Sequence, residues 1–256
     1  MIAFISDIHS NTEALSAVLA VVDQRKVDRL ICLGDIIGYG PEPRETLRTV
    51  MARCEFSLRG NHEEGALLNA SDFNPRARVA IDWTKKQLTP PACQRQESFA
   101  FWNYLDKLER SRRDGEMLLV HGSPKDPVRE YIVPKDAADR AKMNEWFSLF
   151  DGARICFVGH SHVPGVYLES GRYLSPSDVG NSFELDGGEF KGQRAIVNIG
   201  SVGQPRDGDT RASFVFFDGK RVHFVRVEYA FEQTMAKIRA TGVLPEYLAE
   251  RLANGR

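Results

Sequence analysis

Side chains that bind metal ions recur in short motifs along this chain, and each motif follows a run of apolar residues. The motifs combine imidazole, carboxylate and amide groups, and they are Asp7-Ile8-His9, Gly34-Asp35, Gly60-Asn61-His62-Glu63, His121-Gly122 and Gly159-His160-Ser161-His162. Mixed nitrogen and oxygen ligands suit Mn, Fe, Zn or Co ions better than Ca²⁺. The pattern therefore predicts a metal-dependent hydrolase.

The apolar runs before the first motifs are predicted to be strands that alternate with helices. Residues 2–6, 29–33 and 55–58 have the composition of buried strands, whereas residues 11–24 and 42–51 carry apolar side chains at helical spacing. This βαβαβ order predicts neighbouring parallel strands joined by right-handed crossovers.

The remainder of the chain is predicted to add two helical segments and further strands. A helical insert is expected over about residues 63–113 and a C-terminal helical segment over about residues 229–253. Strands are expected at residues 116–120, 154–158, 165–168, 182–185, 194–199, 213–217 and 222–227, and the last two are predicted to form a hairpin. We expect one α/β domain over residues 1–256, with a first sheet richer in parallel pairs and a second richer in hairpins.

Because ligands of open α/β sheets gather at the carboxyl ends of strands, the motifs are expected to converge there. The residues that follow predicted strands are Asp7, Asp35, Asn61, His121 and His160. A single Asp or His in such a place is usually a turn or packing residue. Five coincidences of this kind favour a common site.

Composition and charge limit the range of functions. With 42% hydrophobic residues, the 256-residue chain can bury a sizeable core, and its net charge of −1 disfavours a protein that coats nucleic acid or anionic membrane. Four cysteines without CxxC spacing predict reduced structural thiols. No signal-peptide pattern opens the chain, and no apolar stretch approaches the ~20 residues of a membrane span. We therefore expect a cytoplasmic protein without a membrane or stable nucleic-acid partner, and a homo-oligomer stays open.

The ordered motifs resemble the calcineurin-like metallophosphoesterase superfamily, and the match runs from Asp7 to His162. The longer strings Ser6-Asp7-Ile8-His9-Ser10-Asn11, Gly34-Asp35-Ile36-Ile37-Gly38-Tyr39-Gly40-Pro41 and Asn198-Ile199-Gly200-Ser201-Val202-Gly203-Gln204-Pro205-Arg206 resemble its small bacterial and archaeal phosphodiesterase branch, which includes relatives of diadenosine tetraphosphatases. The resemblance implies a two-sheet α/β/β/α sandwich. Ile199 stands where the branch commonly has proline, a departure expected to change loop stiffness more than chemistry.

By this resemblance, two divalent transition metals share one carboxylate, and Mn²⁺ is the ion favoured in vitro. The implied ligands are Asp7, His9, Asp35 and His162 for one metal, and Asp35, Asn61, His121 and His160 for the other. A carboxylate shared by two ions offsets their charge and holds them about 3.5 to 4 Å apart.

The resemblance also implies attack on phosphorus by metal-bound hydroxide, with Asp35 and His62 as the catalytic residues. His62 is expected to act as a general acid or to stabilise the developing oxyanion, and an orienting role stays open. Glu63 either orients His62 or is a solvated carboxylate at a helix start. His223 is expected to be structural.

Three further residues are candidates for substrate contact. Arg206 could hold phosphate through its guanidinium fork, or it could form an ion pair in a turn with Asp207 or Asp209. Asn11 could contact substrate or cap a helix. Tyr39 could stack on a base or leaving group, or it could be a packed loop residue.

Three classes of function follow from these residues. The first is a phosphodiesterase for small or nucleotide-type substrates, which the near-neutral charge and the resemblance favour. The second is a phosphomonoesterase, acting on phosphoproteins or dinucleoside polyphosphates, because residues 59–63 (RGNHE) are similar to a string in protein phosphatases. The third, a non-catalytic scaffold, is least expected because every matched position keeps a competent ligand. A nuclease that processes DNA ends is disfavoured by the lack of a basic excess.

Overall fold

The first sheet joins the predicted βαβαβ unit to the predicted hairpin. The structure, a computed structural model, describes residues 1–71 and 73–256, and within these residues the strands form two sheets of six. The first sheet has the order β3 (Phe56–Ser57), β2 (Arg29–Cys32), β1 (Ile2–Ile5), β11 (Ala212–Phe217), β12 (Arg221–Val227) and β9 (Ser182–Glu184). Strands β1, β2 and β3 are parallel, whereas β11 pairs antiparallel with both β1 and β12.

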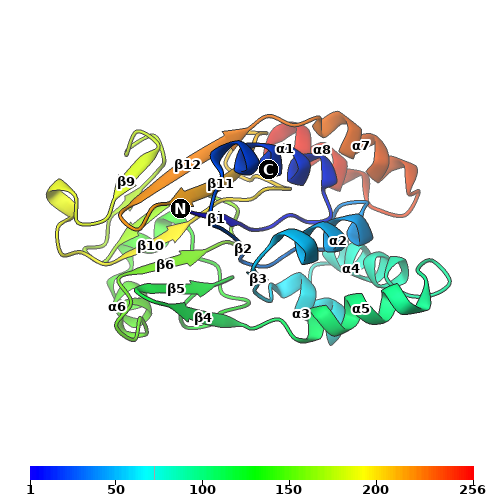
Figure 1. Ribbon diagram of the computed structural model, residues 1–256, viewed down its shortest axis with the longest axis horizontal. Coiled ribbons are helices and arrows are strands. Elements are labelled where there is room, and N and C mark those ends of the chain that lie inside the picture. The colour runs from blue at the N-terminus through cyan, green and yellow to red at the C-terminus, as the bar shows by residue number, and fades with distance from the viewer. Residues whose placement is uncertain (72) are drawn as a thin grey trace.

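The second sheet lies beneath the first in Figure 1 and is also mixed. Its order is β4 (Ser111–Asp114), β5 (Met117–Val120), β6 (Ile155–Val158), β10 (Ala195–Asn198), β7 (Gly165–Leu168) and β8 (Tyr173–Leu174). Strand β6 is parallel to β5 and β10, and the remaining pairs are antiparallel. The expectation of one parallel-rich sheet and one hairpin-rich sheet is therefore wrong, because the β11–β12 hairpin pairs with β1 in the first sheet.

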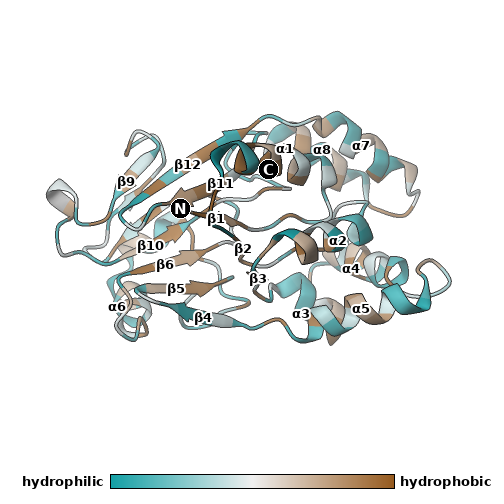
Figure 2. Cartoon of the chain, viewed as in Figure 1, coloured by the Kyte–Doolittle hydropathy of each residue, from teal (hydrophilic) through white to brown (hydrophobic). Residues whose placement is uncertain are grey.

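Strand alternation places two hydrophobic layers on opposite faces of each sheet. In β1, Phe4 points between the sheets and stacks on Phe157 of β6 with ring centroids 4.3 Å apart, whereas Ala3 and Ile5 face the helices. In β6, Cys156 faces outward instead, into a third cluster around Trp146. Figure 2 shows the hydrophobic residues concentrated in these central strands. The order of layers is helix, sheet, sheet, helix, which confirms the predicted sandwich.

Helices cover the outer faces and gather at one end of the sandwich (Figure 1). They are α1 (Thr12–Arg25), α2 (Pro43–Arg53), α3 (Asn61–Leu67), α4 (Pro75–Gln87), α5 (Arg95–Asp106), α6 (Arg140–Ser148), α7 (Phe231–Ala240) and α8 (Glu246–Asn254), with short 3-10 turns at Pro134–Ala138 and Gly188–Phe190. None of the helices that the structure describes is long and apolar enough to cross a membrane.

The helical insert differs slightly from its predicted extent. Helix α3 begins at Asn61, and the last residues of the predicted insert form the edge strand β4 instead of helix. The C-terminal segment is helical as expected, with a break between α7 and α8. That a single domain spans the chain stays a prediction.

Candidate metal centre

The predicted ligands meet at the carboxyl ends of strands from both sheets. Asp7 follows β1, Asp35 follows β2, Asn61 opens α3 after β3, and His121 and His160 follow β5 and β6. Hydrogen bonds join the first two loops, because the backbone N–H groups of Asp7 and His9 donate to the carbonyls of Gly34 and Asp35 at 3.0 Å each. The facing edges of the two sheets thus create one site.

Most of the ligand residues hold a left-handed backbone. The φ angles are 54° at Asp7, 50° at His9, 52° at Asp35, 64° at His160 and 61° at His162. Such conformations cost on the order of 1–3 kcal/mol each and are retained where surrounding contacts fix them, often at functional sites. Their concentration around one point indicates that the loops are shaped for the side chains they present.

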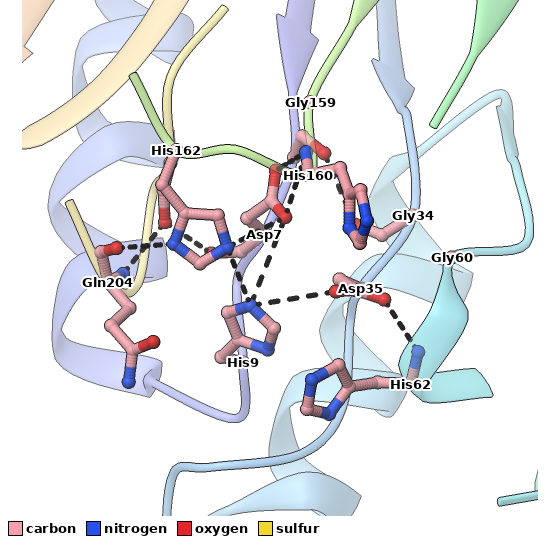
Figure 3. A network of polar contacts seen from close by, with 12 residues as sticks. Asp7, His9, Gly34, Asp35, Gly60, His62, Gly159, His160, His162 and Gln204 are labelled. Carbon is pink, nitrogen blue, oxygen red and sulfur yellow. Dashed lines mark hydrogen bonds and ion pairs between the residues drawn. The ribbon is translucent and has the colours of Figure 1, made fainter. Parts of the chain in front are cut away.

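The first cluster consists of Asp7, His9 and His162, as Figure 3 shows. His162 Nε2 lies 3.1 Å from Asp7 Oδ1 and 3.2 Å from His9 Nε2. All three side chains are buried. The arrangement brings one carboxylate oxygen and two ring nitrogens to a common point.

The second cluster consists of Asp35, His121 and His160, with Asn61 beside them. His121 Nε2 lies 3.4 Å from Asp35 Oδ2, 3.1 Å from His160 Nδ1 and 3.2 Å from Asn61 Oδ1. The four residues are the set implied for the second metal.

Asp35 connects the two clusters. Its Oδ2 lies 3.7 Å from His9 Nε2 in the first cluster and 3.4 Å from His121 Nε2 in the second. Its other oxygen, Oδ1, accepts the backbone N–H of His62 at 2.9 Å, which fixes the carboxylate plane. The Asp35 carboxylate is therefore within reach of donor atoms from both clusters.

In each ligand-type histidine, one ring nitrogen forms a hydrogen bond with a backbone carbonyl, and this bond determines the protonation of the ring. Each of the four ligand-type histidines has one ring nitrogen beside a backbone carbonyl, and these contacts are His9 Nδ1 to Ile37 at 3.2 Å, His162 Nδ1 to Gln204 at 2.5 Å, His121 Nδ1 to Leu33 at 3.0 Å and His160 Nε2 to Arg129 at 3.0 Å. A carbonyl can only accept, so each of these nitrogens carries the proton. In the first cluster, the lone pairs of the neutral His9 and His162 rings therefore face each other.

Facing lone pairs repel unless a cation lies between or beside them, so the donor set fits two divalent metals. Burial and the nearby charge of His62 lower the pKa of His9, and burial also lowers the pKa of His162, so neither ring offers a proton to the other. Burial disfavours charge on His121 as well, but Asp35 outweighs it and raises the pKa of His121 to about 9. The buried carboxylates thus attract positive charge to the site.

The two carboxylates are held ionised. Burial alone raises the pKa of Asp7 and of Asp35, but the neighbouring histidines outweigh it, and both pKa values lie below the usual range of a carboxyl. Metal ligands of this type must be deprotonated, so the electrostatics agree with metal binding.

His62 lies beside the clusters without belonging to the predicted ligand set. One of its ring nitrogens is within 4.8 Å of donor atoms of His9 and Asp35, and its ring contacts Tyr39 at a centroid distance of 4.3 Å. Its Nδ1 is buried without a hydrogen-bond partner. Gly38 makes room for the ring, because a Cβ at position 38 would lie 2.1 Å from His62 Nδ1.

Glu63 holds the loop that carries Asp35, which neither interpretation from the sequence anticipated. The side chain is fully buried, and its carboxylate accepts the backbone N–H groups of Asp35, Ile36, Ile37 and Gly60 at 2.8 to 3.1 Å. It is therefore neither solvated nor bonded to the His62 ring. Burial and the charge of Asp35 raise its pKa to about 7, against the opposing effect of these hydrogen bonds.

A pocket of about 290 Å³ opens beside the metal centre. It is lined by Tyr39, Asn61, Phe73, Asn74, Arg129, Tyr131 and His160. Tyr131 stacks on the His160 ring at a centroid distance of 3.7 Å, and it is about half exposed. Tyr39 lines the pocket, but its side chain is buried in a hydrophobic cluster with α4 and α8, so the interpretation as a packed loop residue is confirmed and substrate contact stays a prediction. Phe73 and Tyr131 were missed because single aromatic residues in a loop carry no motif.

The alternative ion pair of Arg206 is wrong. Asp207 pairs with Arg226, and Asp209 pairs with Arg211 at 2.6 Å, so both acids already have partners. Arg206 instead donates from Nη2 to Gln204 Oε1 at 2.8 Å, and its guanidinium lies 5.8 Å from the centroid of Tyr39.

Asn11 caps α1, and none of the metal-type clusters contains His223. Asn11 Oδ1 accepts the backbone N–H of Ala14 at 3.1 Å, and Nδ2 donates to the Gly203 carbonyl at 2.9 Å. The capping interpretation is therefore confirmed. His223 lies in β12, with Nδ1 3.5 Å from Ser182 Oγ.

Comparisons with known proteins give matches over most or all of the chain. Residues 1–221 match the family model described as a calcineurin-like phosphoesterase superfamily domain. An uncharacterized protein of Methanocaldococcus jannaschii is 38% identical over 262 residues, which cover all of this chain and 98% of the relative. The crystal structure of a metallophosphoesterase from Sphaerobacter thermophilus superposes with a TM-score of 0.82 at 41% identity, covering 100% of this chain and 99% of that one. A hypothetical protein from Pyrococcus horikoshii shares the fold, with a TM-score of 0.74 at 18% identity and coverage of 100% and 99%.

Proposed function

Because this chain belongs to the calcineurin-like phosphoesterase superfamily and is therefore a phosphoric ester hydrolase, we propose that it cleaves phosphodiester bonds of small or nucleotide-type substrates with two divalent metals. The observation that carries the proposal is Asp35, whose Oδ2 lies 3.7 Å and 3.4 Å from imidazole nitrogens of the two clusters. Members of the superfamily generally bind divalent metals in a dinuclear site.

The proposed ligands follow from the clusters. Asp7, His9, Asp35 and His162 hold one metal, and Asp35, Asn61, His121 and His160 hold the other. Two divalent ions in such a site act as Lewis acids on phosphoryl oxygens and lower the pKa of water enough to supply a nucleophile near neutral pH. Nitrogen and oxygen donors together are compatible with Mn²⁺, our choice for assays.

His62 is proposed to stabilise the negative charge that develops on the leaving oxygen, by donating a hydrogen bond from its neutral ring. Its ring lies beside both Asp35 and His9 and has a buried nitrogen without a partner. Burial lowers its pKa to about 4 despite the opposing charge of Asp35. A donor must be within hydrogen-bond reach of the leaving group in the bound complex, and a side chain at the edge of the clusters can meet that requirement.

The size and lining of the pocket favour a small substrate that carries a planar group. Three aromatic side chains, Tyr39, Phe73 and Tyr131, line it beside the ligands Asn61 and His160. Its volume of about 290 Å³ lies at the small end of ligand sites. The net charge of −1 supports a free small molecule as the substrate, without a stable nucleic-acid or membrane partner. The four free cysteines support the cytoplasm as its compartment.

The test is Mn²⁺-dependent hydrolysis of bis-p-nitrophenyl phosphate beside p-nitrophenyl phosphate. The diester should be turned over with the higher kcat/KM, Asp35→Asn should abolish turnover, and His62→Ala should lower it by roughly 10²-fold or more. His223→Ala, a histidine outside the clusters, is the matched control and should keep wild-type rates.

Preference for the monoester would replace the diesterase with the phosphomonoesterase alternative. Absence of turnover with Mn²⁺, Fe²⁺, Zn²⁺ and Co²⁺, in protein that still binds these metals, would contradict hydrolysis of such esters altogether.

A further inference from the structure

Two arginines lie close to the ring of Tyr39, which is beside the candidate metal site. Arg206 comes from the loop after β10, and Arg251 comes from α8. Their guanidinium carbons lie 5.8 Å and 5.9 Å from the Tyr39 centroid. Both guanidinium groups are therefore within the range of a cation–π contact with the same ring.

Neither arginine forms an ion pair with an Asp or Glu among residues 1–71 and 73–256. Arg206 donates from Nη2 to Gln204 Oε1, and its Nε is buried without a partner. Arg251 donates from Nε to an oxygen of Arg256, the last residue of the sequence, and so to a terminal carboxylate. The nearest acids in sequence to Arg206, Asp207 and Asp209, are held by Arg226 and Arg211.

Two neighbouring positive charges repel each other, more strongly where water is partly excluded, and one terminal carboxylate at Arg251 does not neutralise both. Both guanidinium groups are only partly exposed. Burial, followed by the charge of Arg206, lowers the pKa of Arg251 to about 10. Such a pair is stabilised when an anion binds between the two groups.

The two arginines are close to the histidines of the candidate metal site. The Tyr39 ring lies 4.3 Å from the His62 ring and 4.7 Å from the His9 ring, measured between centroids. The charge of Arg206 also contributes to the lowered pKa values of His62 and His162, after burial. Only the Tyr39 ring would thus separate an anion bound to the two arginines from the phosphate group that is cleaved at the metals.

Helix α8 is held in place to present Arg251. Leu248 and Leu252 of α8 pack in one cluster with Tyr39 and with Ala77 and Ala80 of α4. This helix lies outside residues 1–221, the part of the chain that the family model matches. The C-terminal segment therefore adds a positive charge from outside the part of the chain that the family model matches.

We propose that Arg206 and Arg251 form a second anion-binding subsite, and that the substrate carries a second phosphate group besides the one that is cleaved. The inference rests on the proposed function and narrows its substrate class. Guanidinium groups present paired N–H donors that match the oxygens of phosphate and of carboxylate, and phosphate is the anion that the substrate of a phosphoesterase supplies.

The test compares binding of AMP and α,β-methylene-ADP to the full-length Mn²⁺-loaded protein by isothermal titration calorimetry. Both ligands carry adenosine, so they differ in the second phosphorus group. Wild type should bind α,β-methylene-ADP roughly tenfold more tightly than AMP, and Arg251→Ala and Arg206→Ala should each remove most of that preference. Arg239→Ala is the control, because Arg239 lies on α7, is half exposed and pairs with Glu246.

Wild type without a preference, or a preference that survives both substitutions, would overturn the subsite. An equal loss of affinity for both ligands would also overturn it, since the pair would then bind the phosphate that is cleaved. Arg251→Gln repeats the measurement if the alanine variant does not fold. Turnover of bis-p-nitrophenyl phosphate by the same wild-type sample tests the hydrolase itself, so failure of the function and failure of the subsite are separate results.

Discussion

Gly38 determines how closely His62 can approach the centre. The residue has a φ of +89°, and a Cβ there would meet His62 Nδ1 at 2.1 Å. A methyl group would therefore displace the ring as well as strain the backbone. The requirement for glycine here follows from contact with a catalytic candidate, not from the turn alone.

Gly38→Ala is expected to lower kcat for the diester by roughly tenfold or more while Mn²⁺ content stays near the wild-type value, because His62 moves and the ligands do not. Gly219→Ala is the matched control, since Gly219 has a φ of +98° with no atom within 4 Å of the added Cβ. Equal losses in the two variants, measured by steady-state kinetics, would show that backbone strain alone is responsible.

Glu63 stabilises the Asp35 loop through backbone groups. Glu63→Ala should lower the free energy of unfolding by about 3 kcal/mol in urea titrations, because several buried N–H groups lose their acceptor. Mn²⁺ affinity should fall with it. Glu250→Ala, at an exposed position of α8, should change neither quantity. Wild-type stability and metal affinity in Glu63→Ala would contradict this role.

The predicted ligands meet because of a general property of α/β sheets, and that much could be inferred from the sequence. Residues that follow parallel strands of one sheet lie at the same edge, as Asp7 and Asp35 do after β1 and β2. The role of Glu63 could not be inferred, because its partners are backbone groups that have no sequence signature. The same holds for Tyr131, whose stacking on His160 depends on a loop of irregular structure.

Asn11, at the start of α1, connects three segments of the chain. Asn11 caps the helix, donates to the Gly203 carbonyl and accepts from Thr234 Oγ1 at 3.0 Å. The cap of α1 is thus tied to the loop after β10 and to α7.

Asn11→Ala should therefore destabilise the protein by more than the ~1 kcal/mol typical of a lost helix cap. Asn74→Ala provides the comparison, because Asn74 caps α4 through the backbone N–H of Ala77 at 3.0 Å. The measurement is the free energy of unfolding of each variant, compared with that of the wild-type protein. Equal destabilisation would show that the bonds from Asn11 to Gly203 and Thr234 contribute little.

Elements with strong local periodicity were predicted well, and pairings between distant strands were not. The start of the chain and the β11–β12 hairpin follow the predicted order. The edge strands β4 and β8 and the helix α6 were missed, since short polar or edge segments have weak patterns. Assignment of the hairpin to the first sheet depends on its contact with β1, which no local pattern encodes.

At the scale of the whole molecule, the metal centre depends on the packing of one sheet against the other. Asp7 and Asp35 belong to the first sheet, whereas His121 and His160 belong to the second. Phe157 packs between the sheets, 4.3 Å from Phe4 and 5.3 Å from Phe217 between ring centroids. Contacts of this kind fix the distance between the two halves of the site.

Phe157→Ala should lower the free energy of unfolding by about 3–5 kcal/mol, because it creates a cavity in the shared core. The loss should be accompanied by weaker Mn²⁺ binding. Phe99→Ala, at a residue that is 74% exposed, should leave both quantities unchanged. A folded Phe157→Ala protein with wild-type metal affinity would show that the site does not depend on this packing.

We propose that the two sheets together hold two metals that share Asp35. The most direct test is the metal content of the purified protein after saturation with Mn²⁺ and removal of excess, combined with electron paramagnetic resonance. We predict two Mn²⁺ per chain with a spectrum of exchange-coupled ions, and loss of the coupled signal in Asp35→Asn. A single uncoupled Mn²⁺ in the wild-type protein, or coupling that persists in Asp35→Asn, would contradict the account.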